Sequence, residues 1–225
     1  MLRRPVLWTG SWLETRRVTA VDFELYLVTD RNQAGGRDLL WILEQALDGG
    51  VKAVQLREKD LSGRDLFSLA ETAQRLCQRY DAALFINDRV DVAMAVDAAG
   101  VQLSKLSLPV VTARSLLGTQ KIIGVSTHSL QEAREAERAG ADFVLFGPVY
   151  FTPSKAAYGA PQGLRALKTI VANISLPVYA IGGIKPENID ATRKLGVRGV
   201  ALISAIASAA NPKAAAETML RQLRC

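Results

Sequence analysis

Three polar side chains at alternate positions form the first group in this sequence whose types and spacing suggest chemistry. They lie in the segment "QLREKD" (55–60), which follows a short apolar run. Because successive side chains of an extended strand point to opposite sides, Gln55, Arg57 and Lys59 are expected to share one side. Arginine can bind phosphate oxygens with two parallel hydrogen bonds, and lysine adds a point charge. The group predicts a site for a polyphosphate or carboxylate ligand, unless Arg57 simply pairs with a nearby acid at a solvated strand end.

The segment "INDRVD" (86–91) supplies an amide and a carboxylate after another apolar run. Asn87 and Asp88 could orient a phosphate and a divalent cation, since magnesium usually takes one or two carboxylates together with substrate phosphates. Asp88 could equally cap a helix that starts near Val90. Capping and metal binding compete for the same oxygen, and this stretch alone favours capping.

The chain has one histidine, His128, in the segment "GVSTHS". A histidine can act as a general acid or base near neutral pH. The alternative is that His128 packs at a helix start that Ser126 or Thr127 caps. A second histidine is absent from the sequence, so we expect no histidine pair at a metal.

A long segment, "GPVYFTPSKAAYG" (147–159), interrupts the apolar and helical patterns and carries one lysine, Lys155. It exceeds the roughly 2 to 6 residues typical of a connection between a strand and the next helix. Its glycines and prolines disfavour a helix and permit hinges. We expect a mobile lid whose lysine closes over a bound anion, with a structured loop and a solvated lysine as the alternative.

The elements that must position these residues alternate regularly along the chain. Eight apolar runs are each followed by helical periodicity, and the runs lack the strict alternation of half-exposed strands, as expected for parallel strands covered on both faces. This pattern predicts a (β/α)8 TIM barrel formed by residues 23–225 after an N-terminal extension (1–22), with an open doubly wound sheet as the weaker alternative. The predicted strands span 25–30, 53–58, 83–88, 100–103, 122–127, 143–149, 177–183 and 199–205.

In such barrels the chemistry lies at the C-terminal ends of the strands, where the candidate residues fall. The last two predicted strands end in "AIGGIKPEN" and "ALISAI". Backbone N–H groups at Gly182 and Gly183, with Ser204, could bind a phosphate between these two loops. The alternative is a tight left-handed turn that the connection alone requires.

Composition narrows the class of protein. The chain has 225 residues, 49% of them hydrophobic, and a net charge of +6. Basic residues are spread along helices and aromatics make up only 6%, which disfavours nucleic-acid binding. Cys77 and Cys225 predict no structural disulfide and a reducing cytoplasm, and the start of the chain is a poor secretory signal. No apolar run reaches the roughly 18 residues of a membrane span, so we expect small-molecule partners, with a homo-oligomer left open.

Together the candidates predict two anionic sites, which a reaction joining two phosphorylated small molecules with loss of diphosphate would use. Seven segments, in order over nearly all of residues 23–224, resemble the thiamine-phosphate synthase family and its thiazole tautomerase branch. They are "YLVTD", "VQLREKDL", "FINDRVDVAMAVDAAGVQL", "IGVSTHS", "GADFVLFGPVYFTPSK", "AIGGIKPEN" and "ALISAI". The resemblance implies a transferase of thiamine biosynthesis in which Mg²⁺-bound hydroxymethylpyrimidine diphosphate loses diphosphate and the resulting carbocation is captured by a thiazole phosphate.

The resemblance also implies roles for individual residues. On the pyrimidine side, Gln55 binds the ring, Asp88 ligates the metal, Ser126 neighbours the leaving group, and the diphosphate is held by Arg57, Lys59, Asn87 and Lys155. The thiazole phosphate side comprises Thr152, Ser154, Gly183, Ile203 and Ser204. Catalytic roles fall to Lys155, Ser126 and His128.

One departure from the family pattern concerns the metal. Synthases continue from the fourth strand as His-x-Gly-Gln-x-Asp, whose Asp is the second metal ligand, but this chain reads "QLSKLS" with Lys105 and Ser107 in place of that Gln and Asp. The tautomerase branch also lacks the Asp and moves a proton with a histidine at the position of His128, although it tends to lose the pyrimidine-side groups that this chain keeps. We expect a synthase, with a tautomerase or a non-catalytic regulator that binds thiazole or thiamine phosphates as alternatives.

Overall fold

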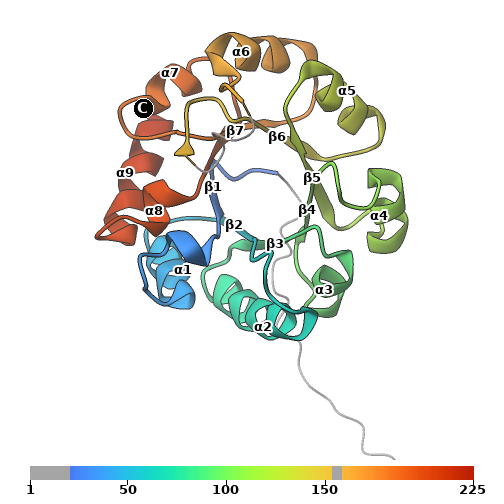
Figure 1. Cartoon of the computed structure of the whole chain (residues 1–225), viewed down its shortest axis with the longest axis vertical. Helices are drawn as coiled ribbons and strands as arrows, with labels where there is room; N and C mark the ends of the chain where they lie inside the picture. The colour runs from blue at the N-terminus through green and yellow to red at the C-terminus, as the bar shows by residue number, and fades with distance from the viewer. Residues whose placement is uncertain (1–20, 154–158) are drawn as a thin grey trace, which may run out of the picture.

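The computed structural model of the chain describes residues 21–153 and 159–225 (Figure 1). Residues 1–20 of the predicted extension, together with Ser154 and Lys155, lie outside the described residues. Among the helices in the described ranges, none is both long and apolar enough to cross a membrane.

In the described residues, eight parallel strands close into a barrel in their order along the chain, and β1 pairs with both β2 and β8. Helices surround the barrel in Figure 1, and the predicted (β/α)8 TIM barrel is confirmed. The strands are β1 (Leu25–Val28), β2 (Ala53–Leu56), β3 (Ala83–Asn87), β4 (Gly100–Leu103), β5 (Ile122–Thr127), β6 (Phe143–Phe146), β7 (Val178–Ile181) and β8 (Gly199–Leu202). The helices are the 3₁₀-helix η1 (Arg31–Gln33) and α1 (Leu39–Asp48), α2 (Gly63–Arg79), α3 (Val90–Ala95), α4 (Val110–Leu117), α5 (Leu130–Arg138), α6 (Gly163–Asn173), α7 (Ile189–Arg193), α8 (Ser204–Ala207) and α9 (Pro212–Arg224).

Each strand sends alternate side chains into the barrel and out to the helices. On β3, Ala83 and Phe85 belong to the interior cluster, whereas Leu84 and Ile86 pack between the strands and the helices. Both faces of the strand are therefore buried. This explains why the sequence shows near-continuous apolar runs.

Aromatic rings fill the part of the interior nearest the N-terminal ends of the strands. The rings of Phe23, Tyr26, Phe85, Phe143 and Tyr179 have centroid separations from 4.7 to 6.3 Å, and the Tyr179 hydroxyl donates to the Phe23 carbonyl at 2.6 Å. Edge-to-face and tilted ring pairs of this kind add about 0.5 to 1.5 kcal/mol each beyond their burial. The described residues therefore give the barrel a packed aromatic floor toward the N-terminal ends of the strands.

Six strands end earlier than the sequence predicts, namely β1, β2, β3, β6, β7 and β8. After β2 the Arg57 N–H donates to the Thr29 hydroxyl at 2.9 Å and not to a backbone carbonyl, so the strand ends at Leu56. After β7, Gly182 and Gly183 take φ values of +98° and +65°, which a strand cannot contain. β6 likewise ends at Phe146, before the glycine and proline of the long loop.

Candidate active site

The interior side chains at the C-terminal ends of the strands divide the barrel mouth into a polar and an apolar half. On β2 to β5, the alternation that places Ala53, Phe85 and Ile122 inside continues to polar residues, which are Gln55, Asn87, Gln102 and Ser126. On β6 to β8 the equivalent interior residues are Leu145, Ile181 and Ile203. The polar half can hydrogen-bond one ring while the apolar half packs against another.

Gln55 is the most rigidly placed of the predicted residues. Its side chain is buried, and its Nε2 lies 3.4 Å from the Tyr26 hydroxyl oxygen as donor. Burial raises the pKa of Tyr26 well above its ordinary value, so this hydroxyl stays protonated at neutral pH. The Gln55 amide is thereby fixed above the aromatic floor, as a ring-binding group requires.

Gln102 is a buried polar residue to which the sequence analysis assigned no role. It is 1% exposed, its Nε2 donates to the Ser126 hydroxyl at 3.1 Å, and its Oε1 has no hydrogen-bond partner within the described residues. A buried carbonyl oxygen without a partner costs about 1 to 3 kcal/mol. The signal in the sequence was a glutamine inside the otherwise apolar run "GVQL", which a ligand's hydrogen-bond donor would explain.

Arg57 and Lys59 are positioned by the acid between them. The Glu58 carboxylate, 5% exposed, accepts from the Thr29 hydroxyl at 2.6 Å and from the Arg31 N–H at 3.2 Å. This ties the end of β2 to the end of β1. The alternative, in which Arg57 pairs with a nearby acid, is not realised in the described residues, because no described acid forms an ion pair with either Arg57 or Lys59. Half-buried Arg57 and exposed Lys59 are therefore both available to an anion.

Asp88 does not cap a helix, and that alternative is wrong. The N-cap of α3 is Arg89, without a side-chain hydrogen bond to the helix. The Asp88 Oδ2 instead accepts from the Asn87 amide at 2.7 Å, and Oδ1 accepts from the Ser104 hydroxyl at 3.0 Å and from the Ser107 hydroxyl at a shorter distance. Asp88 also has φ of +59°, a left-handed conformation that is uncommon outside glycine and often marks functional sites.

The glycine pair after β7 supports the loop that follows β6. A Cβ on Gly183 would lie 2.5 Å from the Phe151 carbonyl oxygen, and a Cβ on Gly182 would lie 2.6 Å from the Pro148 Cα. The Tyr150 N–H donates to the Gly182 carbonyl at 3.0 Å. Steric need therefore accounts for both glycines, and the predicted phosphate contact of Gly183 stays a prediction.

The remaining predicted residues on the thiazole side lie around the same end of the barrel. Ile203 is half-buried at the N-cap of α8, and Ser204 is exposed in the first turn of that helix. Thr152 is half-buried in the loop after β6. Ser154 and Lys155 are outside the described residues, so their roles and the lid stay predictions.

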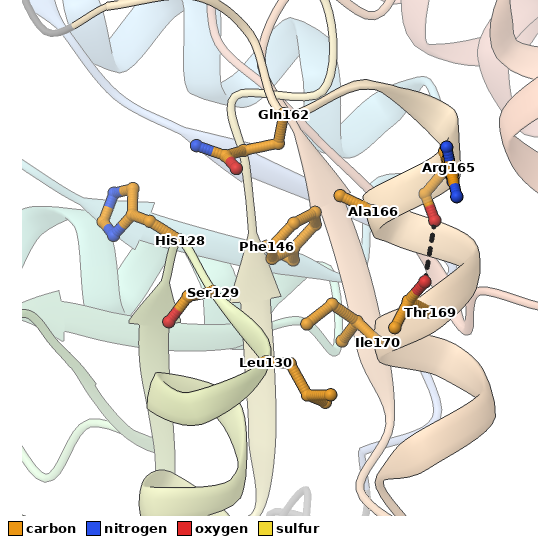
Figure 2. A pocket seen from close by; sticks show the side chains of 9 residues that line it. All are labelled: His128, Ser129, Leu130, Phe146, Gln162, Arg165, Ala166, Thr169 and Ile170. Atoms are coloured by element: carbon orange, nitrogen blue, oxygen red, sulfur yellow. Dashed lines mark hydrogen bonds between the residues drawn. The ribbon is translucent and has the colours of Figure 1, made fainter.

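His128 lines a different pocket, of about 410 Å³, between α5, α6 and the outer side of β6 (Figure 2). Its side chain is 53% exposed, and its Nδ1 lies 3.2 Å from Glu132 Oε2. The predicted cap by Ser126 or Thr127 is wrong, because the Ser129 hydroxyl accepts from the Glu132 N–H at 3.1 Å. The other lining residues are Ser129, Leu130, Phe146, Gln162, Arg165, Ala166, Thr169 and Ile170. Phe146, which also lines this pocket, packs between the strands and the helices. The pocket that contains His128 is therefore outside the barrel interior that holds the polar residues.

Comparison with known proteins gives one consistent result. The family model for thiamine monophosphate synthase matches residues 25–206. A Geobacter sulfurreducens protein provisionally named thiamine-phosphate synthase is 53% identical over 203 residues, covering 90% of this chain and 95% of its own. The thiamine-phosphate synthase of Clostridium novyi is 42% identical over 88% of this chain and 98% of its own. The structure of a thiamine phosphate pyrophosphorylase from Pyrococcus furiosus superposes with a TM-score of 0.82 at 38% identity, over 90% of this chain and 96% of that one.

Proposed function

Since this chain belongs to the thiamine monophosphate synthase family, we propose that it is a transferase that condenses hydroxymethylpyrimidine diphosphate with thiazole phosphate. The products are thiamine phosphate and diphosphate. The relatives named for this activity match nearly the whole barrel.

The observation that carries this function is a pair of cations without an ion-pair partner in the described residues, beside the polar half of the barrel mouth. Arg57 and Lys59 face no described acid, and the Asn87 amide and the Asp88 carboxylate stand at the end of the neighbouring strand. Charge-assisted bonds from arginine and lysine to a diphosphate are shorter and stronger than neutral hydrogen bonds. These residues would stabilise the negative charge that develops as diphosphate leaves.

The two halves of the mouth suit the two rings of the reaction. Buried amides at Gln55 and Gln102 can hydrogen-bond a nitrogen heterocycle, and the free Gln102 Oε1 accepts one of its donors. Ile181 and Ile203 offer an apolar surface to the second ring. A carbocation formed between them would be quenched by water, so closure by the loop that carries Lys155 would protect it.

Magnesium fits this site through one carboxylate. Asp88 Oδ2 accepts only the Asn87 amide within the described residues, which leaves it one lone pair for a metal. No group of three or more histidine, cysteine or acidic residues that could hold a metal occurs in the described part of the chain. When bound, magnesium would neutralise diphosphate charge, and Asp88 would hold it while the substrate oxygens and water complete its coordination.

The tautomerase alternative depends on His128 moving a proton on the thiazole ring. The histidine lies beside Glu132 in a pocket bounded by α5 and α6, and the sequence keeps the pyrimidine-side groups that the tautomerase branch tends to lose. Both facts support the synthase over the tautomerase and over a regulator without turnover.

The test is a paired assay on the purified protein. With magnesium chloride, hydroxymethylpyrimidine diphosphate and thiazole phosphate, we expect thiamine phosphate and diphosphate in equal amounts by chromatography. A parallel assay follows isomerisation of the thiazole phosphate alone. Isomerisation without condensation would replace the proposal with the tautomerase, and saturable binding without turnover would replace it with the regulator.

A further inference from the structure

We propose that the hydroxyls of Ser104 and Ser107 engage one oxygen of the Asp88 carboxylate, so that the site takes magnesium only as its diphosphate chelate. This inference rests on the proposed function and concerns the order in which metal and substrate bind.

The connection between β4 and α4 is folded around the Asp88 carboxylate. The Ser107 hydroxyl donates to Asp88 Oδ1 and accepts from the Ser104 N–H at 2.6 Å. The Ser104 hydroxyl donates to the same Oδ1 at 3.0 Å, and the Ser107 N–H donates to the Ser104 carbonyl at 3.0 Å. Every contact is part-buried, so these serines are structural partners of the carboxylate and not solvated loop residues.

Counting lone pairs shows how little of Asp88 remains for a metal. A carboxylate oxygen has two acceptor positions, and Oδ1 lies within hydrogen-bond distance of both hydroxyls, whose oxygens are also 3.0 Å from each other. Oδ2 accepts from Asn87 and keeps one position. Magnesium demands near-octahedral coordination and dehydrates reluctantly. A single carboxylate oxygen with one free acceptor position does not compensate a free magnesium ion for the water ligands that it would lose on binding.

The magnesium diphosphate chelate differs from the free magnesium ion because its diphosphate group carries negative charge that cations of the protein can bind. Diphosphate supplies two or more oxygens to the metal and keeps negative charge for the unpaired Arg57 and Lys59. Lys105, exposed in the same β4 to α4 connection, adds a third cation near this end of the barrel. Binding the chelate therefore satisfies the cations and the remaining Oδ2 position together, whereas the free ion meets Asp88 alone.

Calorimetry with three titrants tests the order of binding in the full chain. Wild-type protein is titrated with magnesium chloride, with inorganic diphosphate in a chelator-treated buffer, and with the preformed one-to-one chelate. We expect no saturable binding of magnesium alone up to millimolar concentration, and an affinity for the chelate at least about tenfold higher than for diphosphate alone. Saturable submillimolar binding of magnesium alone, or equal affinities for chelate and diphosphate, would overturn the inference.

The variant Ser107→Asp restores a second carboxylate next to Asp88. It should raise the affinity for magnesium alone by about tenfold or more over wild type, because carboxylate number tunes the affinity of such sites. Ser115→Asp is the matched control, since Ser115 is exposed on α4, and it should leave magnesium binding as in wild type. Circular dichroism confirms that each variant is folded. A folded Ser107→Asp that binds magnesium no better than Ser115→Asp would count against the inference.

A result that contradicts the proposed binding order can be distinguished from one that contradicts the proposed function. A protein that forms thiamine phosphate but binds free magnesium tightly keeps its function and refutes the binding order. A protein that binds the chelate selectively but forms no product keeps the binding order and refutes the function.

Discussion

At the scale of single residues, the proposed diphosphate site can be tested through the charge of Arg57. Replacing Arg57 by alanine should raise the dissociation constant for the magnesium diphosphate chelate by at least about tenfold, because a hydrogen bond to a charged group contributes about 1.5 to 3 kcal/mol. The measurement is calorimetric binding of the magnesium diphosphate chelate. Arg75→Ala removes the same charge from the exposed face of α2 and serves as the control. Equal affinities of the two variants would show that Arg57 does not contact the anion.

The sequence predicted the residue types at this site better than it predicted their contacts. Spacing predicted an anion site at Arg57 and Lys59, which stays a prediction, and the structure leaves both side chains without a described acidic ion-pair partner. The contact of Ser107 with Asp88 could not be predicted, because it depends on how the loop after β4 folds back on the loop after β3. The role of Glu58 was missed for a similar reason, since its partners Thr29 and Arg31 belong to a different strand end.

At the scale of elements, the loop after β6 is held by the turn after β7. Gly183→Ala should destabilise the protein for two reasons: its φ of +65° is strained for alanine, and the new Cβ would meet the Phe151 carbonyl at 2.5 Å. The strain alone costs about 1 to 2 kcal/mol. Urea unfolding should show a larger loss than that, and the displaced loop should lower turnover as well.

Gly140→Ala separates the two causes. Gly140 has φ of +87°, and a Cβ there would meet nothing within 4 Å, so this variant carries the strain without the clash. It should lose about 1 to 2 kcal/mol and keep wild-type turnover. If Gly183→Ala matched Gly140→Ala in both stability and turnover, the support of the loop by this turn would be refuted.

The existence and order of the strands followed from the sequence, whereas the C-terminal ends of six of them did not. Apolar runs report burial on both faces, and that burial continues past the last ladder hydrogen bond. Glu58, for example, is buried although β2 ends at Leu56. The end of a strand is decided by local events such as the Thr29 hydroxyl taking the Arg57 N–H. Such contacts involve residues from other elements, so the local sequence of a strand does not predict where the strand ends.

At the scale of the whole molecule, the closed barrel followed from eight repeated units, but the unequal halves of its mouth did not. Polar interior residues at the ends of β2 to β5 and apolar ones at the ends of β6 to β8 become one surface only when the barrel closes. The same closure buries the aromatic floor. Burial of this floor requires the complete barrel, and its effect on the free energy of unfolding can be measured as a function of pH.

Alkaline pH should destabilise the barrel through the tyrosines of this floor. Burial raises the pKa of Tyr26 well above its ordinary value, and burial also raises the pKa of Tyr179. In the unfolded chain a tyrosine loses its proton near pH 10, whereas the folded barrel keeps it. Above that pH the unfolded state binds fewer protons, so the free energy of unfolding should fall by about 1.4 kcal/mol per pH unit for each such tyrosine. The loss should begin at about pH 10 and continue up to the raised folded pKa.

The variant Tyr26→Phe isolates one of these contributions. Urea unfolding at steps between about pH 10 and pH 11.5 should give a slope against pH that is shallower than wild type by about 1.4 kcal/mol per unit. Cys77, whose burial raises its pKa to about 12, contributes equally to both proteins and cancels in the comparison. Tyr80→Phe, at the half-buried C-terminal end of α2, controls for the loss of a tyrosine outside the floor and should keep the wild-type slope. Identical slopes for wild type and Tyr26→Phe would mean that the floor opens to solvent before the barrel unfolds, and the closed interior on which the mouth is built would then not persist at high pH.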